Sequence, residues 1–273
     1  MTSGRFAHLS PKQLVPELAD RGLYLASEST MYRLRRELGL TRHRPMSRTE
    51  VTRASKVHSA TAPNQVWSWD ITWLPTTLRG RYVYLYLVLD VWSRRIVGWT
   101  VEESENAEAA AELVKRICSD NDVDPRGLVL HADNGKPMRG STMVSTLQSL
   151  GIIPSFSRPH VSDDNPYSEA LFRTLKHTPV YPRLPFPDAE AARRWVAHFV
   201  AWYNSQHRHS GIRYVTPDER HFGADAGILA KRAALYRRAR ATNPERWSRS
   251  TRNWSPIGVV VLNPEPRTAK QAA

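Results

Sequence analysis

Three apolar runs in the first half of the chain are joined by very short connections, and this feature most restricts the fold. We expect strands over 66–72, 81–90 and 95–101. The turns between them lie around Arg79-Gly80 and Ser93-Arg94. Strands joined by such short connections usually pair antiparallel with their neighbours. The chain is therefore expected to open its sheet with antiparallel strands.

Further along the chain, segments with helical spacing alternate with short apolar segments. The spacing predicts helices at 106–117, 141–150, 165–177 and 188–206, with short strands at 128–132 and 152–156. Such alternation after an antiparallel start predicts an α/β fold, a mixed sheet flanked by helices. At 273 residues and 41% hydrophobic content, the chain can hold one sizeable core with smaller appendages.

The balance of charge indicates a nucleic-acid partner. The chain has 39 Lys plus Arg against 26 Asp plus Glu, a net charge of +13. A strongly basic protein gains affinity for nucleic acid from phosphate neutralisation and counterion release. A GC-rich genome would also favour Arg over Lys, but it does not explain the net excess of cations.

Cysteine usage and hydropathy indicate the compartment. The single Cys118 excludes an intramolecular disulfide and a cysteine-based zinc site, which suits a reducing cytosol. No run approaches ~18 apolar residues, and the N-terminus lacks a signal peptide's apolar stretch. We expect a soluble, cytoplasmic protein without a membrane partner.

Three acidic residues carry the candidate chemistry. Asp70 ends a predicted strand, Asp133 follows another, and Glu169 lies on a predicted helix 35 residues beyond Asp133. A lone carboxylate is usually a solvated surface charge. Two carboxylates at strand ends and a third on a helix can converge on one or two hard cations such as Mg²⁺. Paired metals of this kind serve phosphodiester cleavage or transfer.

Six short stretches surround these acids and resemble a known family. They are Gln65 to Thr72, Tyr84 to Asp90, His131 to Gly135, Ser157 to Pro159, Asn165 to Lys176 and Trp202 to Asn204. In this order they resemble the catalytic core of transposases and retroviral integrases, the DDE polynucleotidyl transferases. The similarity is closest to bacterial transposases of the insertion-sequence-three type, and it covers roughly residues 60 to 220.

The resemblance implies both a fold and an activity. The fold is a ribonuclease-H-like mixed five-stranded sheet, with the integrase-like core at 65–220. Asp70, Asp133 and Glu169 are then the catalytic residues and the ligands of two Mg²⁺ or Mn²⁺ ions. The implied reaction is metal-dependent DNA cleavage and strand transfer for a mobile element. Implied partners are the element's inverted-repeat ends, target DNA and further copies of the chain on DNA.

Basic and polar side chains beside the acids are candidate DNA contacts. Arg173 and Lys176 follow Glu169 by four and seven positions and share its helix face. In the family, the basic residue seven positions after the glutamate grips DNA. A salt-bridged surface face is the alternative for both. Arg158, Asn134 and Lys136 are also expected to contact DNA; Lys136 stands where the family often has a small hydroxyl residue.

Residues 1–45 are expected to form a helix-turn-helix-like DNA-binding segment. Ser27 can cap a helix over 28–38, with Arg33 and Arg36 facing DNA. The apolar positions expected to face inward are Met31, Leu34 and Leu38. An ordinary helical hairpin remains open by pattern alone. Residues 46–64 are then a basic linker, either along DNA or free in solvent.

Residues 221–273 are expected to be a basic C-terminal element. A basic helix over 228–240 and a short strand or hairpin between Trp254 and Asn263 are predicted. The element would bind DNA or bridge subunits, with a solvated tail as the alternative. The chain also starts at the helix-turn-helix-like segment, which suggests a downstream frameshift product or a truncated copy.

Other residues receive structural interpretations. Asp90 is expected to hydrogen-bond within the fold, His131 to support Asp133, and the Trp67, Trp69 and Trp73 set to pack in the core. Two other functions remain open. A catalytically idle DNA-binding regulator would not need the three acids, and a structure-selective nuclease would not need the basic flanking segments.

Overall fold

The computed structural model describes residues 11, 14–15, 18, 23, 25–38, 57–158, 164–178 and 181–264. They belong to two units, one up to Thr52 and one from Arg53 onward. Most of residues 1–22 of the predicted helix-turn-helix-like segment, and the predicted linker up to residue 56, lie outside the described residues. None of the described helices combines the length and apolar character needed to cross a bilayer.

In the N-terminal unit, helix α2 (Glu28–Glu37) forms as predicted. The Ser27 side chain accepts a hydrogen bond from the Thr30 amide at 3.3 Å and caps the first turn. Met31 is buried. Arg33 and Arg36 are exposed, as expected. The inward prediction for Leu38 is wrong: it lies just past the last helical residue and is 62% exposed.

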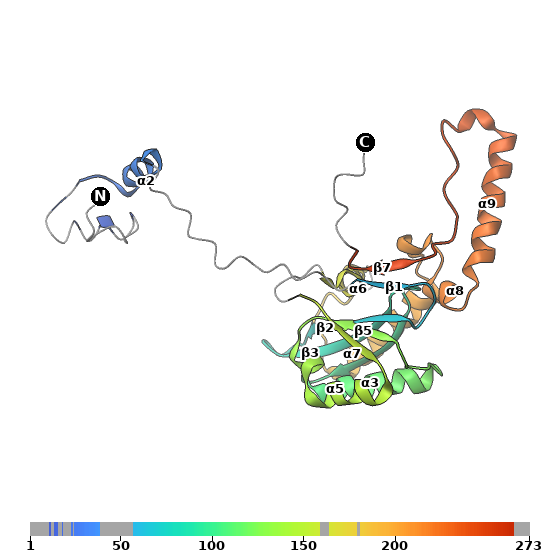
Figure 1. Cartoon of the computed structure of the whole chain (residues 1–273), viewed down its shortest axis with the longest axis horizontal. Coiled ribbons are helices and arrows are strands. Elements are labelled where there is room, and N and C mark those ends of the chain that lie inside the picture. Colours follow the sequence, from blue (N-terminus) through green and yellow to red (C-terminus); the bar gives the residue numbers. More distant parts are fainter. Residues whose placement is uncertain are drawn as a thin grey trace. The chain divides into compact units, whose positions relative to one another are not determined.

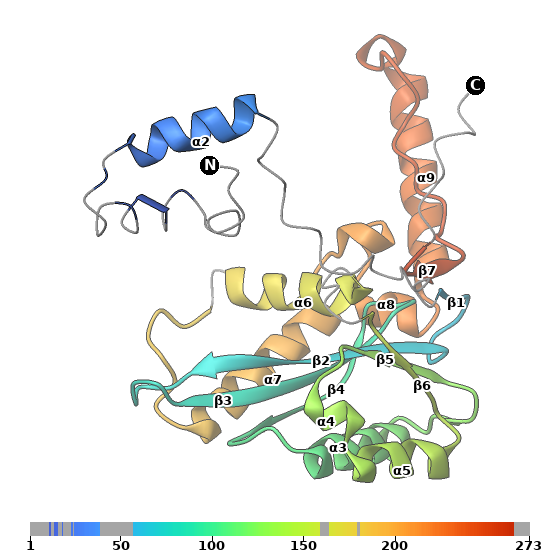
Figure 2. The ribbon, with the colours of Figure 1, turned by 60° about the vertical axis from the view of Figure 1, so that its left-hand side comes forward.

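The second unit is built on a mixed five-stranded sheet, as predicted (Figure 2). Its strands are β2 (Val66–Pro75), β3 (Tyr82–Asp90), β4 (Ile96–Glu102), β5 (Val129–Ala132) and β6 (Ile153–Phe156). The spatial order is β4-β3-β2-β5-β6. The β2–β3 and β3–β4 pairs are antiparallel, whereas β5 pairs parallel with both β2 and β6. The short turns between the first three strands therefore predicted their pairing correctly.

Helices cover both faces of this sheet (Figure 2). One face packs against α3 (Ala107–Asp120), α4 (Lys136–Arg139) and α5 (Ser141–Leu150), and the other against α6 (Pro166–His177) and α7 (Ala189–Ser205). The strands supply alternate residues to the two cores. On β3, Tyr86 and Val88 join the first core, and Leu85 and Leu87 join the second.

The chain then adds four short elements and the 18-residue helix α9 at one end of the sheet (Figure 2). These are η2 (Ser210–Ile212), α8 (Pro217–His221), α9 (Asp225–Thr242), η3 (Pro244–Arg246) and β7 (Val260–Leu262). Strand β7 pairs antiparallel with β1 (His58–Ala60), which the sequence placed in a linker. Buried Val91 and Val66 pack with this small sheet. The C-terminal segment is thus joined to the core by strand pairing and apolar contact.

Trp73 corrects one expectation about core packing. Trp67 and Trp69 are buried, but Trp73, further along β2, is 55% exposed. Its indole Nε1 donates to Glu105 Oε1 at 2.8 Å, and its ring contacts Tyr82 and Tyr84. It therefore lies on the surface rather than in the core.

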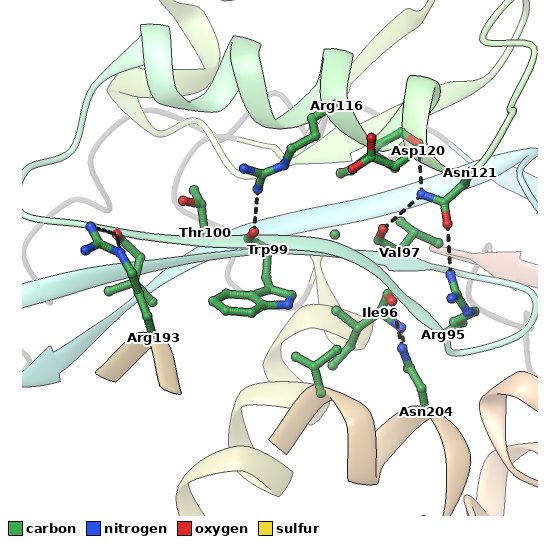
Figure 3. Close-up of a pocket in the computed structure, with 14 residues that line it drawn as sticks. Arg95, Ile96, Val97, Trp99, Thr100, Arg116, Asp120, Asn121, Arg193 and Asn204 are labelled. Atoms are coloured by element: carbon green, nitrogen blue, oxygen red, sulfur yellow. Dashed lines mark hydrogen bonds between the residues drawn. The ribbon is translucent and has the colours of Figure 1, made fainter. Parts of the chain in front are cut away.

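Strand β4 is an edge of the sheet, and side chains hydrogen-bond its carbonyl oxygens (Figure 3). Arg116 Nη2 donates to Trp99 O at 2.8 Å, and Arg193 donates to Val101 O through Nη2 at 2.8 Å and Nε at 3.1 Å. Asn204 Nδ2 donates to Ile96 O at 2.9 Å, and Asn121 Nδ2 to Val97 O at 3.5 Å. A sheet edge blocked in this way is a poor template for further strand pairing.

We predict that Gly98→Ala destabilises the fold by ~1–3 kcal/mol, because overpacking displaces core side chains. A Cβ at Gly98 on β4 would lie 2.2 Å from Ile117 Cγ1 of α3. Gly258→Ala is the control, since no atom lies within 4 Å of its added Cβ. Urea denaturation measures both variants. Equal free energies of unfolding for the two variants would show that β4 and α3 can move apart to fit the added methyl group at no cost in stability.

Candidate active site

The register of the parallel ladder brings two of the predicted acids together. Trp69 on β2 pairs with Ala132 on β5, so Asp70 and Asp133 are the next residues on neighbouring chains. Both line a cavity of about 160 Å³, together with Glu105 from the loop after β4. The two aspartates therefore share one site, as predicted. The predicted strand-end position is wrong for Asp70, which lies in the middle of β2, whereas Asp133 directly follows β5.

The third acid, Glu169, lies in the first turn of α6, and buried hydrogen bonds attach that turn to β2. Ser68 Oγ donates to Asn165 Oδ1 at 2.5 Å and lies 2.6 Å from Ser168 Oγ. Asn165 Nδ2 also donates to the Trp69 carbonyl at 3.2 Å. These contacts fix the start of α6 beside the strand residues that precede Asp70. Glu169 itself is exposed.

The pKa of Asp70 depends on its burial and on the nearby acids. The pKa of Asp70 is raised to about 7, and burial is the largest cause. The Ile71 amide lowers this pKa, whereas the charges of Asp133, Glu169 and Glu105 contribute to the rise. Glu169 therefore acts on Asp70 without lining the cavity. Among the described residues, no three His, Cys, Asp or Glu side chains are already arranged to hold a metal ion.

A buried hydrogen-bond network that includes Ser157 and His131 holds the Asp133 side chain. Ser157 Oγ donates to Asp133 Oδ1 at 2.6 Å and lies 3.4 Å from His131 Nε2. His131 Nε2 lies 2.9 Å from the Asp164 carbonyl. A carbonyl oxygen only accepts hydrogen bonds, so Nε2 carries the proton in this tautomer. The His131 Nδ1 then accepts from Ser155 Oγ at 2.9 Å. Burial lowers the pKa of His131, which favours this neutral form.

The remaining predicted site residues divide into two groups. Asn134 and Arg158 make contacts within the chain: Asn134 Nδ2 donates to the Ser157 carbonyl at 2.6 Å, and Arg158 pairs with Asp164 at 2.8 Å. The exposed group consists of Lys136 at the start of α4 and Arg173 and Lys176 on α6. DNA contact stays a prediction for all five.

Sequence reasoning missed two residues at this site, Ser157 and Glu105. Ser157 belongs to one of the stretches that resemble the family, so the sequence marked its position but did not indicate that it binds Asp133. Glu105 lies in a run of acids after β4 and had no signal, because only the fold brings it to the cavity.

We predict that Asp70→Asn stabilises the metal-free protein at pH 8, by up to ~4 kcal/mol. The pKa of Asp70 is raised from 3.8 to about 7 in the folded chain. The folded state therefore keeps a proton that the unfolded chain releases, and wild-type stability falls as pH rises from 4 to 7. The variant should lack this fall. Urea titrations in EDTA across this range measure it.

Addition of Mg²⁺ provides the control for that experiment. A bound cation favours the ionised carboxylate, so Mg²⁺ should raise the stability of the wild type more than that of the variant. If Asp70→Asn is no more stable than the wild type at pH 8 in EDTA, burial and the neighbouring acids do not raise the pKa of Asp70 to about 7.

The fold and the site together define a class of protein. A mixed five-stranded sheet flanked by helices is the ribonuclease-H-like fold of polynucleotidyl transferases, and here acids lie on β2, directly after β5 and on α6. A cryo-EM structure of the simian T-cell lymphotropic virus intasome in complex with the PP2A regulatory subunit B56 gamma contains a chain of this fold. The match has a TM-score of 0.51 and 16% identity, and it covers 78% of this chain and 74% of that one.

Sequence comparisons narrow the class to a family. Two models described as "Integrase core domain" match residues 60–162 and 150–217. The transposase of insertion sequence element IS904 from Lactococcus lactis is 30% identical over 198 residues, 72% of this chain and 75% of that protein. The chain belongs to the insertion-sequence transposases of the IS3 type, which have an integrase core domain.

A second relative shows how far the similarity extends. The InsF transposase of insertion sequence IS3A from Escherichia coli is 28% identical over 161 residues, which cover 59% of this chain. The same alignment covers 54% of that relative, so the chain matches about half of its length.

Proposed function

We propose that this chain catalyses metal-dependent cleavage and strand transfer of DNA at the ends of a mobile element. The observation that carries the proposal is the pairing of Asp70 and Asp133 in one cavity, with Glu169 acting on Asp70 from α6. Family membership supports the same activity.

The residues present fit a divalent cation. All the candidate donors are carboxylate oxygens, which hard cations such as Mg²⁺ and Mn²⁺ prefer. Their mutual repulsion at Asp70 is the charge that a cation would compensate. Asp70, Asp133 and Glu169 would hold two such ions. When bound, the metals supply charge stabilisation at the attacking and leaving oxygens of the phosphodiester.

The chain's own side chains position the reacting groups. Ser157 holds one oxygen of Asp133, and the Asn165 contacts hold α6 against β2. Water would attack a phosphodiester at the element end and release a 3′-hydroxyl. That hydroxyl would then attack a phosphodiester of target DNA. Each step exchanges one P–O bond for another, so positioning and charge stabilisation account for the catalysis.

DNA would be bound by basic residues around the site and by the flanking segments. Around the carboxylates these are Lys176, Arg173, Arg158 and Lys136, together with the neutral, polar Asn134. Arg33 and Arg36 would contact element ends from the 1–45 segment. The core would span 65–220, with 46–64 as the linker and 221–273 as the basic C-terminal element. The chain would act as a homo-oligomer on DNA in the bacterial nucleoid.

The test supplies purified chain with Mg²⁺, a target plasmid and duplexes that carry the inverted repeats flanking the gene. The proposal expects end duplexes joined to the plasmid. Nicked duplexes without joined products would indicate a nuclease, and binding without cleavage would indicate a regulator.

We predict that Lys176→Ala lowers strand joining about tenfold, as loss of a charged phosphate contact should. Glu169 and Lys176 are seven residues, about two turns, apart on α6, so both would face the same DNA strand. Truncating an exposed Lys should change stability by under ~0.5 kcal/mol. Lys176→Arg should restore part of the activity. Exposed Lys115 on α3 is the control, and equal joining by Lys176→Ala and Lys115→Ala would make Lys176 an ordinary surface charge.

A further inference from the structure

The first turn of α6 is attached to the C-terminal strand β7 as well as to β2. Tyr167 lies in this turn, two residues before Glu169. Its hydroxyl group donates to the carbonyl oxygen of Val261, the middle residue of β7, at 2.9 Å. The start of α6 lies beside β7 in both ribbon views (Figures 1 and 2). The helix that carries the third acid therefore contacts a strand 94 residues further along the chain.

A buried arginine holds the ring of the same tyrosine. The guanidinium carbon of Arg94, in the turn between β3 and β4, lies 4.0 Å from the centroid of the Tyr167 ring. Arg94 is only 8% exposed, and its Nη1 has no hydrogen-bond acceptor among the described residues. Burial lowers the pKa of Arg94, and Tyr167 is the largest of the influences that oppose this shift. Because a cation–π contact is stronger where water is excluded, Arg94 restricts the position of the Tyr167 ring.

Strand β7 is itself firmly attached to the core. It pairs with β1 along its whole length. The side chains of Val260 and Leu262 are buried in an apolar cluster that includes Val66 of β2. Tyr167 packs against this cluster and also against the core between the sheet and helices α6 and α7. The Val261 carbonyl is therefore an acceptor in a fixed place, and the hydroxyl group of Tyr167 is held to it.

The position of Glu169 depends on how this turn is held. Glu169 is exposed, so packing around its own side chain does little to direct it toward Asp70. Bonds of Ser68 and Asn165 attach the turn to β2, and Tyr167 attaches it to β7. The groups of a metal site must be held within about 0.5 Å of their productive positions. Loss of one attachment would therefore change how well the Glu169 carboxylate reaches a shared cation.

Strand β7 lies outside the part of the chain that matches the family models. The matches to the integrase core domain end at residue 217, and β7 begins at Val260. We propose that Tyr167 is a positioning residue for Glu169, through which β7 fixes the third carboxylate relative to Asp70 and Asp133. The C-terminal segment thus completes the carboxylate site. This inference rests on the proposed function only for the assignment of Glu169 as a metal ligand.

The test measures Mn²⁺ binding to the full chain without DNA, from the electron paramagnetic resonance signal of free Mn²⁺. Tyr167→Phe removes the hydroxyl group and keeps the ring that Arg94 contacts. It should weaken Mn²⁺ binding about fivefold, as loss of one hydrogen bond does. Tyr181→Phe is the matched control, because Tyr181 is also half-buried and packs against the same core as Tyr167. It should bind Mn²⁺ within about twofold of the wild type.

A second background separates positioning of Glu169 from a general loss of structure. Glu169→Gln alone should weaken Mn²⁺ binding about tenfold, because an anionic oxygen donor is lost. If Tyr167 acts through Glu169, adding Tyr167→Phe to Glu169→Gln should change the Mn²⁺ affinity by less than about twofold. A purely structural role would lower the affinity by the same factor in both backgrounds. Unfolding midpoints equal to that of the wild type confirm that the variants fold.

Equal Mn²⁺ affinities of Tyr167→Phe and Tyr181→Phe would overturn the proposal. So would a fivefold loss from Tyr167→Phe in the Glu169→Gln background. If Glu169→Gln alone binds Mn²⁺ as tightly as the wild type, both this inference and the proposed metal site are wrong. No cleavage is measured, so a missing effect of Tyr167 with a normal effect of Glu169 leaves the proposed strand transfer standing.

Discussion

Asp70→Asn is expected to lose Mg²⁺-dependent nicking of element-end DNA by a factor on the order of 10³ or more, while DNA binding is retained. Asp133→Asn and Glu169→Gln should behave in the same way. Each change replaces an anionic oxygen donor by a neutral amide of similar shape, so a cation would be held less firmly at the site. Nicking of labelled end duplexes measures the loss, and anisotropy with the same duplexes measures binding.

Glu105→Gln is the matched control, because Glu105 lines the same cavity as Asp70 and Asp133. Its Oε1 accepts from the Trp73 indole at 2.8 Å, so we expect its loss of activity to stay within about tenfold. Full nicking by any of the three variants would remove that residue from the site. Loss in Glu105→Gln with retention in Glu169→Gln would make Glu105 the third acid.

The second large effect concerns the link between the C-terminal segment and the core. Arg220→Ala is expected to destabilise the protein by about 3–5 kcal/mol, as breaking a buried charged pair does. Arg220 is only 1% exposed and lies 3.6 Å from Asp225. Its Nε and Nη2 donate to the Trp92 and Ile257 carbonyls, both at 2.8 Å. The substitution would remove the donor to these part-buried carbonyls and leave the buried Asp225 carboxylate without this cation.

Arg208→Ala is the control for this prediction, because Arg208 is exposed and its ion pair with Glu219 is only partly buried. Such pairs contribute roughly 0–1 kcal/mol. Urea denaturation of both variants gives the two free energies. If Arg220→Ala loses no more than Arg208→Ala, the C-terminal segment is not held to the core through Arg220.

The sequence predicted the five-stranded sheet well, because the short turns and apolar runs that indicate its strands are local features of the sequence. Short turns determine antiparallel pairing, and strand length and apolar runs located β2 to β6 to within a few residues. The β1–β7 pair was not predictable. Each strand has three residues, too few for a periodic pattern, and they pair across most of the chain. The predicted linker at 46–64 is rich in Arg, Thr and Ser, and it therefore included residues 58–60, which form β1 in the structure.

The same distinction applies to polar side chains. Asp90 could be assigned a structural role, and it is buried, with its carboxylate accepting from the Ser93 and Asn64 amides at 2.7 Å. Arg220 gave no such signal, since a basic residue on a short helix usually lies on the surface. Its burial depends on contacts with Trp92 and Ile257, which are distant in sequence.

The candidate site was predictable as far as strand register determines it. Asp70 and Asp133 follow paired residues of adjacent strands, so their proximity follows from the fold. The position of Glu169 depends instead on side-chain bonds at the start of α6, among them those of Ser68 and Asn165. Spacing along the chain carries no information about those bonds.

The most direct test of the metal site is a crystal structure of the chain soaked with Mn²⁺, with anomalous scattering measured at the manganese edge. We expect an anomalous peak between the Asp70 and Asp133 carboxylates, with Glu169 turned to bind the same site. No peak at these aspartates, with Mn²⁺ bound elsewhere or not at all at millimolar concentration, would contradict it.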